Sequence, residues 1–223
     1  MTLGTRRGAA LFGFVVLASS ASAASGRAVE LDVQDVVSRL EQWLDGTRDL
    51  EARFEQSVIS GALGEGPVER GRLSLLRPGH MRWDYLEPER KVALVEGDET
   101  RLYLEEDRQL WLGRLTEQGG LLPILLGGGP PLGELFEASL LATPRHGGDG
   151  TYRLRLVPRS AEPSFHEVLL TLRPPQFGVE LAEVLDAGGN RVRYRFGEWK
   201  RNRGLAPAVF YCEPPPGTEV VTP

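Results

Sequence analysis

Residues 71–85, GRLSLLRPGHMRWDY, predict a β-hairpin with one apolar face. Apolar and polar residues alternate before the Pro78-Gly79 pair, and the alternation resumes after it. Alternation with a period of two places one set of side chains on one face of a strand, and a proline–glycine pair is typical of a turn. The apolar positions of this hairpin are Leu73, Leu75, Met81, Trp83 and Tyr85.

The same alternation continues over most of the chain on either side of the hairpin. Before it, Leu50, Ala52 and Phe54 alternate with charged residues, and the glycine-containing segment 61–67 predicts a hairpin loop. After it, further strands are predicted at 91–96, 100–105, 109–114, 151–157, 165–173, 178–186, 191–199 and 207–212. Regular short strands separated by turns predict a curved antiparallel sheet or barrel.

A helical segment precedes the first strand. Asp32 is a suitable helix cap, and Gly46 is a suitable helix end. Between them, apolar residues recur with helical spacing at Val33, Val36, Val37, Leu40 and Leu44. A helix with one apolar stripe must cover another apolar surface, so we expect this helix to lie on the sheet.

Residues 119–137, GGLLPILLGGGPPLGELFE, interrupt the strand pattern. The apolar cluster in this segment includes Leu122, Ile124, Leu125 and Leu126. Because glycine and proline break regular structure, we expect one or two short helices here. Two roles remain open for them: a mobile cover over the sheet with the glycines as joints, or an ordinary connection that closes the core.

The first 23 residues have the pattern of a secretory signal peptide. Arg6 and Arg7 form a basic start, residues 9–18 are apolar, and residues 21–23 form a cleavage site of small residues. The apolar run is too short to cross a bilayer core about 30 Å thick. We therefore expect residues 1–23 to be removed on export and residues 24–223 to form a single domain.

Composition argues against several classes of function. The 223-residue chain has a net charge of −5, whereas a nucleic-acid partner requires a basic surface. Cys212 is the only cysteine, which excludes an internal disulfide, and we expect it to be a small buried side chain at the end of the last strand. His80, His146 and His166 are scattered, and no nucleophile, phosphate-loop or dinucleotide motif occurs. We therefore expect no catalytic residue, no metal and no cofactor.

Arginines occupy two kinds of position on the predicted strands. Arg191, Arg193 and Arg195 alternate with apolar residues, which indicates a solvated face; a face for nucleic acid or anionic lipid is the alternative. Arg77 instead continues the apolar set of its strand. If it points inward, its guanidinium needs acceptors such as the backbone carbonyls of a covering helix. If the strand ends before it, the side chain turns to water.

Several motifs in one order resemble a known family. The chain contains LEARFEQ at 50–56, RPGHMRWDY at 77–85 and FYCEPPPG at 210–217. In combination these motifs resemble the outer-membrane lipoprotein carrier protein family, LolA. The resemblance runs over nearly the whole of residues 24–223.

The resemblance implies a mainly β fold with a helical lid (α+β), an unclosed antiparallel β-barrel of about eleven strands. It implies a monomeric periplasmic chaperone, not an enzyme. Such a carrier binds the acyl chains of lipoproteins released by an inner-membrane ABC transporter and delivers them to an outer-membrane acceptor or to the outer membrane itself. The alternative is an envelope regulatory domain of the same fold that senses lipids or lipoproteins.

The resemblance also implies roles for individual residues. Arg77, in the Arg-Pro motif, is expected to hold the lid closed. The candidates for the acyl-chain cavity are Phe54, Leu73, Leu75, Met81, Trp83 and Tyr85. The candidates for the lid are Val33, Val36, Val37, Leu40, Leu44, Leu122, Ile124, Leu125 and Leu126.

Overall fold

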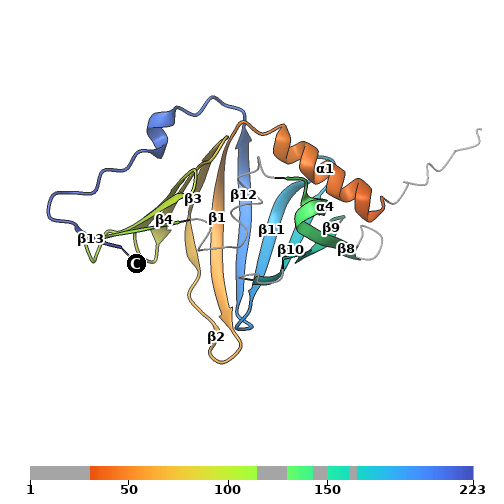
Figure 1. The fold of residues 1–223 in the computed structure, drawn as a ribbon, viewed down its shortest axis with the longest axis horizontal. Coiled ribbons are helices and arrows are strands. Elements are labelled where there is room, and N and C mark those ends of the chain that lie inside the picture. Colours follow the sequence, from red (N-terminus) through yellow and green to blue (C-terminus); the bar gives the residue numbers. More distant parts are fainter. Residues whose placement is uncertain (1–30, 115–129, 143–149, 161–164, 223) are drawn as a thin grey trace, which may run out of the picture.

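One continuous β-sheet makes up most of the protein (Figure 1). The fold is that of a computed structural model, which describes residues 31–114, 130–142, 150–160 and 165–222. The strands are β1 (Asp49–Ser60), β2 (Gly64–Glu65), β3 (Glu69–Leu76), β4 (His80–Glu87), β5 (Lys91–Glu96), β6 (Glu99–Leu104), β7 (Gln109–Arg114), β8 (Phe136–Ala142), β9 (Tyr152–Pro158), β10 (Phe165–Arg173), β11 (Gly178–Asp186), β12 (Arg191–Arg201) and β13 (Glu219–Val221). The described residues form thirteen strands, of which β2 has two residues and β13 has three. The other eleven agree with the expectation of about eleven strands.

The sheet is curled but not closed. Its strands follow the order β13-β7-β6-β5-β4-β3-β1-β12-β11-β10-β9-β8, with β2 paired to β1. The two outermost strands, β13 and β8, lie at opposite ends of the sheet (Figure 1). The pairs are antiparallel apart from β13 and β7, which run parallel. The expectation of an unclosed antiparallel barrel is therefore confirmed.

Helix α1 (Val33–Asp45) begins and ends where the sequence predicts. The Asp32 carboxylate accepts a hydrogen bond from the Asp35 backbone N–H at 2.9 Å, and the Gly46 N–H donates to the Gln42 carbonyl. The helix packs over β8, β9 and β11 (Figure 1). Its buried residues are Val36, Val37, Leu40, Trp43 and Leu44. The short helix α4 (Leu132–Leu135) lies beside it, and the Leu132 N–H donates to the Glu41 carboxylate at 2.7 Å.

Paired residues on neighbouring strands point to the same face, so the register separates an inner from an outer face. One inner row runs from β3 to β7 through Leu73, Trp83, Ala93, Leu102 and Trp111. The adjacent outer row runs through Arg72, Asp84, Val92, Tyr103 and Leu110. The inner face carries the hydrophobic core, to which α1 contributes its apolar stripe.

Two segments differ from the sequence-based expectation. The strand predicted at 207–212 is wrong: Pro207–Phe210 form a 3-10 helix, η1, and β13 forms only further on. Pro207 has no N–H to give to a sheet, and its fixed backbone angle suits a first helical turn. In the segment 119–137, α4 is a short helix as expected, but the chain then enters β8, which was not predicted.

The C-terminal segment covers the edge of the sheet at β7. After β12 it passes along the outer face, where the Arg82 Nη1 donates to the carbonyls of Val209 and Tyr211 at 3.0 and 3.2 Å. It then forms β13, in which Glu219 pairs with Gln109 of β7. An unpaired edge strand is open to pairing with another chain, so β13 protects this edge.

None of the helices in the described part of the chain combines the length and the hydropathy that a membrane span requires.

Candidate functional site

A cavity of about 490 Å³ lies over β4–β7. Ligand pockets commonly measure about 300–1,000 Å³, so the cavity is large enough to bind a small molecule or a hydrocarbon chain. The inner-face residues that line it are Trp83, Tyr85, Lys91, Ala93, Val95, Thr100, Leu102, Trp111, Gly113 and Tyr194. Helices α1 and α4 pack on the opposite half of the sheet. The cavity is therefore separate from the part of the core that these helices cover.

Small side chains create the hollow. Ala93 lies opposite Trp83 in the register of β4 and β5, and Gly113 lies opposite Thr100 in that of β6 and β7. A small residue beside a large one leaves space above the sheet, because the core is close-packed elsewhere. Trp111, on the far side, is 44% exposed, so the cavity is open at that wall.

Aromatic rings build the other wall. The Phe54 ring lies edge-on to Trp83 at 4.7 Å and to Tyr85 at 5.0 Å between ring centres. Tyr194, from β12, lies 5.5 Å from Trp83. Edge-to-face pairs at these distances are favourable and restrict ring rotation. The wall is therefore a preformed apolar surface rather than a set of independent side chains.

A polar row crosses the inner face beside this wall; it consists of Gln56, Glu69, Tyr85 and Lys91. Lys91 forms an ion pair with Glu69, and its Nζ lies 4.4 Å from the centre of the Tyr85 ring. The Tyr85 hydroxyl donates to Gln56 Oε1 at 2.7 Å.

Both tyrosines of the cavity remain neutral over a wide pH range. Burial raises the pKa of Tyr85, and the charges of Tyr194 and Glu69 add to the increase. Burial, with a further contribution from Glu69, raises the pKa of Tyr194 to about 12. Both hydroxyl groups therefore keep their hydrogen at neutral pH, and Tyr85 uses its own in the bond to Gln56.

The structure places the six predicted cavity residues together on the inner face. Trp83 and Tyr85 line the cavity itself. Phe54, Leu73, Leu75 and Met81 are buried in the adjoining core.

Sequence reasoning singled out no other residue of the lining, and the large side chains that it missed include Lys91, Trp111 and Tyr194. Each lies on a strand that was predicted, and Trp111 belongs to the alternating pattern of β7. Of the predicted lid residues, Leu122, Ile124, Leu125 and Leu126 lie outside the described part of the chain, and Val33 is partly buried.

Arg77 lies at the C-terminal end of α1. Strand β3 ends one residue earlier, yet the Arg77 side chain is only 13% exposed, and its Nη1 lies 3.8 Å from Asp45 Oδ1. Burial lowers the pKa of the Arg77 guanidinium; Asp45 opposes this decrease, and the Arg201 cation adds to it. Arg77 therefore does not turn out to water, although the strand ends before it.

A second arginine holds the same end of the helix and was not singled out from the sequence. Arg201 donates from Nη2 to the Trp43 carbonyl at 2.9 Å and from Nε to Thr47 Oγ1 at 2.8 Å. Its guanidinium carbon lies 4.8 Å from the centre of the Trp43 ring. Cations favour this location because the last carbonyl groups of a helix carry partial negative charge.

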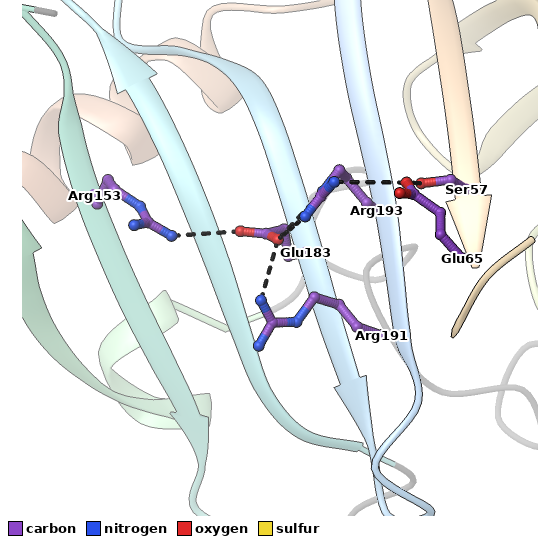
Figure 2. A network of polar contacts seen from close by, with 6 residues as sticks. All are labelled: Ser57, Glu65, Arg153, Glu183, Arg191 and Arg193. Carbon is purple, nitrogen blue, oxygen red and sulfur yellow. Dashed lines mark hydrogen bonds and ion pairs between the residues drawn. The ribbon is translucent and has the colours of Figure 1, made fainter. Parts of the chain in front are cut away.

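The arginine run of β12 takes part in an ion-pair network on the outer face (Figure 2). Glu183 of β11 is the centre of the network: its side chain is 6% exposed and contacts Arg153, Arg191 and Arg193 at 3.3–3.4 Å. Arg193 also lies 3.7 Å from Glu65, which accepts a hydrogen bond from Ser57. These side chains connect strands of the sheet to one another, which accounts for two of the three arginines in the run.

A second cavity, of about 570 Å³, lies on the outer side of the sheet between β6–β7 and residues 211–214. Its lining includes Leu110, Leu112, Tyr211 and Cys212. Cys212 therefore lies in the segment that follows η1 and is only partly buried, so its predicted position as a buried side chain at the end of a strand is wrong.

The inner cavity is the better candidate site of the two, because aromatic rings and a polar row converge on it. Within the described residues, no group of histidine, cysteine and carboxylate side chains could hold a metal ion.

Comparison with known proteins assigns the chain to a family. Residues 45–213 match the family described as outer membrane lipoprotein carrier protein LolA. The chain is 32% identical over 185 residues to the outer-membrane lipoprotein carrier protein of Methylococcus capsulatus, covering 82% of this chain and 86% of that one. It is 30% identical over 210 residues to the protein of the same name from Azotobacter vinelandii, covering 93% and 98% of the two chains.

A solved structure of an uncharacterized conserved protein from Thermus thermophilus has the same fold. It superposes with a TM-score of 0.55 at 16% identity, covering 85% of this chain and 98% of that chain. This likeness concerns the fold alone, whereas the match of residues 45–213 and the two relatives concern the sequence itself. On that basis, the chain belongs to the outer membrane lipoprotein carrier protein LolA family.

Proposed function

We propose that this protein is a periplasmic carrier that shields the acyl chains of lipoproteins on their way from the inner to the outer membrane. The observation that carries the proposal is the cavity of about 490 Å³ on the inner face, bounded by Trp83, Tyr85 and Trp111. The relatives named as outer-membrane lipoprotein carrier proteins support the same cargo. In this proposal residues 1–23 are the export signal and residues 24–223 are the carrier domain.

The proposed activity is reversible binding and not catalysis. Burying one methylene group contributes about 0.8 kcal/mol, so a long acyl chain cannot remain in water but can be held by an apolar cavity. The protein would receive its cargo from an inner-membrane ABC transporter and give it to an outer-membrane acceptor or to the outer membrane itself. Release requires that the cavity bind the cargo less tightly than its destination does.

A pair of variants on one strand tests the cavity. Ala93→Phe would fill the cavity, whereas Val92→Phe places the same side chain on the outer face of β5. Excluding two methylene groups costs about 1.6 kcal/mol, which is more than tenfold in affinity. We expect Ala93→Phe to weaken binding of a fluorescent fatty-acid probe by at least this factor and Val92→Phe to change it little.

Displacement by a triacylated lipopeptide completes the test. The wild-type protein should release the probe when the lipopeptide is added. Equal probe binding by both variants would place the acyl chains elsewhere, and binding of a sugar or nucleotide in preference to the probe would refute the carrier function.

Arg77 is the proposed latch of the lid, helix α1, which covers the half of the inner face beside the cavity. Its guanidinium lies next to Asp45, the last residue of α1, and can donate several hydrogen bonds at once. A contact that exists only while α1 is packed on the sheet opposes its opening.

Substitution of Arg77 tests the latch. Arg77→Leu removes the ion pair with Asp45 and adds apolar surface, so the protein should load cargo but release it more slowly. Arg77→Lys should have a smaller effect, because an ammonium group cannot replace the planar guanidinium. The measurement is transfer of a labelled lipoprotein to acceptor-containing membranes, and wild-type rates of loading and release in Arg77→Leu would refute the latch.

A further inference from the structure

The polar row is unusual for its position. Gln56, Glu69, Tyr85 and Lys91 lie on four consecutive strands of the sheet order, β1, β3, β4 and β5, and all four belong to the inner face. The side chains of Glu69 and Lys91 are only 19% and 23% exposed. A half-buried ion pair contributes little to stability, because desolvation offsets its attraction. A charged pair beside an apolar cavity therefore has no evident stabilising purpose.

The row points toward the cavity rather than away from it. Tyr85 and Lys91 line the cavity directly, and the Lys91 ammonium lies over the Tyr85 ring. An ammonium group has three donors, so Lys91 retains donors beyond its contact with Glu69. The raised pKa values of Tyr85 and Tyr194 leave neutral phenols around it. The cavity thus has the Lys91 ammonium on one side and mainly apolar side chains along the rest.

Trp83 is a second residue of the cavity lining that carries a hydrogen-bond donor. Its side chain is 4% exposed, and its indole Nε1 has no hydrogen-bond partner among the described residues. Buried donors are nearly always paired, so an unpaired one needs an explanation. Trp83 and Tyr85 are two residues apart on β4, which corresponds to about 7 Å along the strand. An acceptor atom carried by a ligand would satisfy the indole N–H.

We propose that Trp83 and the polar row form a subsite for the ester and amide carbonyls through which acyl chains are joined to a lipoprotein. Carbonyl oxygens are acceptors without donors, and they match the Lys91 ammonium and the Trp83 N–H. The acyl chains themselves fill the apolar part over Leu102 and Trp111. This inference rests on the proposed function and adds that the cavity recognises the linkage as well as the hydrocarbon.

Two ligands and four variants test the subsite. The ligands are a synthetic triacylated cysteinyl peptide and an apolar fluorescent dye that has no carbonyl group. Lys91→Met should weaken lipopeptide binding about tenfold, and Trp83→Phe about three- to tenfold, while dye binding changes less than about twofold. Lys91→Arg retains the charge and should restore most of the affinity. Lys200→Met makes the same chemical change at an exposed position of β12 and should have no effect.

The two ligands distinguish failure of the subsite from failure of the carrier function. An equal loss of both ligands in Lys91→Met and Trp83→Phe would show that these side chains only shape the cavity, which overturns the subsite. Wild-type lipopeptide affinity in both variants would also overturn it. If the wild-type protein binds neither ligand, the carrier function itself fails, and the subsite fails with it. Thermal unfolding of each variant shows separately that it is folded, so that a loss of both ligands is not a loss of the fold.

Discussion

Gly71 of β3 allows the closest packing in the aromatic wall of the cavity. A Cβ atom added at this position would lie 2.0 Å from the Asp84 backbone oxygen and 2.8 Å from two carbons of the Phe54 ring. Non-bonded carbon atoms normally lie about 3.5–4.0 Å apart, so a methyl group does not fit. Phe54 is 2% exposed and contacts Trp83 and Tyr85, which leaves its ring little room to move.

We therefore expect Gly71→Ala to destabilise the protein substantially. Overpacking a core costs about 1–3 kcal/mol, and the upper end applies here because one of the two contacts is with backbone. For a domain of about 200 residues, a loss of about 3 kcal/mol corresponds to a fall in Tm of about 6–12 °C. The assay is thermal and urea unfolding of the purified protein, with binding of a fatty-acid probe as the second measurement. Displacement of Phe54 should also weaken probe binding.

Gly197→Ala is the matched control for this change. Gly197 lies in β12 of the same sheet, and a Cβ added there meets no atom within 4 Å. This variant should unfold within about 0.5 kcal/mol of the wild type. If Gly71→Ala is as stable as Gly197→Ala, then the close approach of Phe54 to the strand is not required and the reasoning fails.

Two further predictions concern the core and the response to pH. Leu40 of α1 is 0% exposed, and Leu40→Ala should reduce the free energy of unfolding by about 2–5 kcal/mol in urea titrations. Leu63 is 91% exposed, so the control variant Leu63→Ala should change the free energy of unfolding little. Similar losses in the two variants would contradict the packing of α1. The raised pKa of Tyr194 favours the neutral phenol in the folded state, so its contribution to stability is complete below the ordinary tyrosine pKa of about 10 and declines as the pH rises toward about 12. Tyr194→Phe should therefore lose less stability than the wild type between about pH 9 and about pH 11.5, and equal losses would show that folding does not raise the pKa of Tyr194.

The sequence alone was sufficient for most of the elements and for the family. The period-two pattern identified most strands, because a strand with one face on the core must alternate. Asp32 and Gly46 marked the ends of α1 through local hydrogen bonds that need no tertiary partner. Trp83 and Tyr85 were candidates for the site because they share the apolar face of one hairpin.

Other parts of the site depended on strand neighbours that the sequence does not reveal. Tyr194 reaches the cavity from β12, which pairs with β1 although more than a hundred residues separate the two strands. Lys91 was not recognised as a cavity residue, because its significance depends on Glu69 and Tyr85 beside it. Arg201 was missed for the same reason, since its acceptors lie in the last turn of α1 and just after it.

Alternation therefore predicts which side chains share a face, but it does not say which strands lie side by side. That information comes from long-range pairing, as in β1 with β12 and β7 with β13. In the segment 207–212 the alternation itself was misleading. Its apolar residues occupy alternate positions, but Pro207 has no N–H to donate to a neighbouring strand, and residues 207–210 form a 3-10 helix. The apolar faces were determined by the sequence, whereas the cavity was decided by the tertiary structure, because a hollow forms only where large and small side chains of different strands meet.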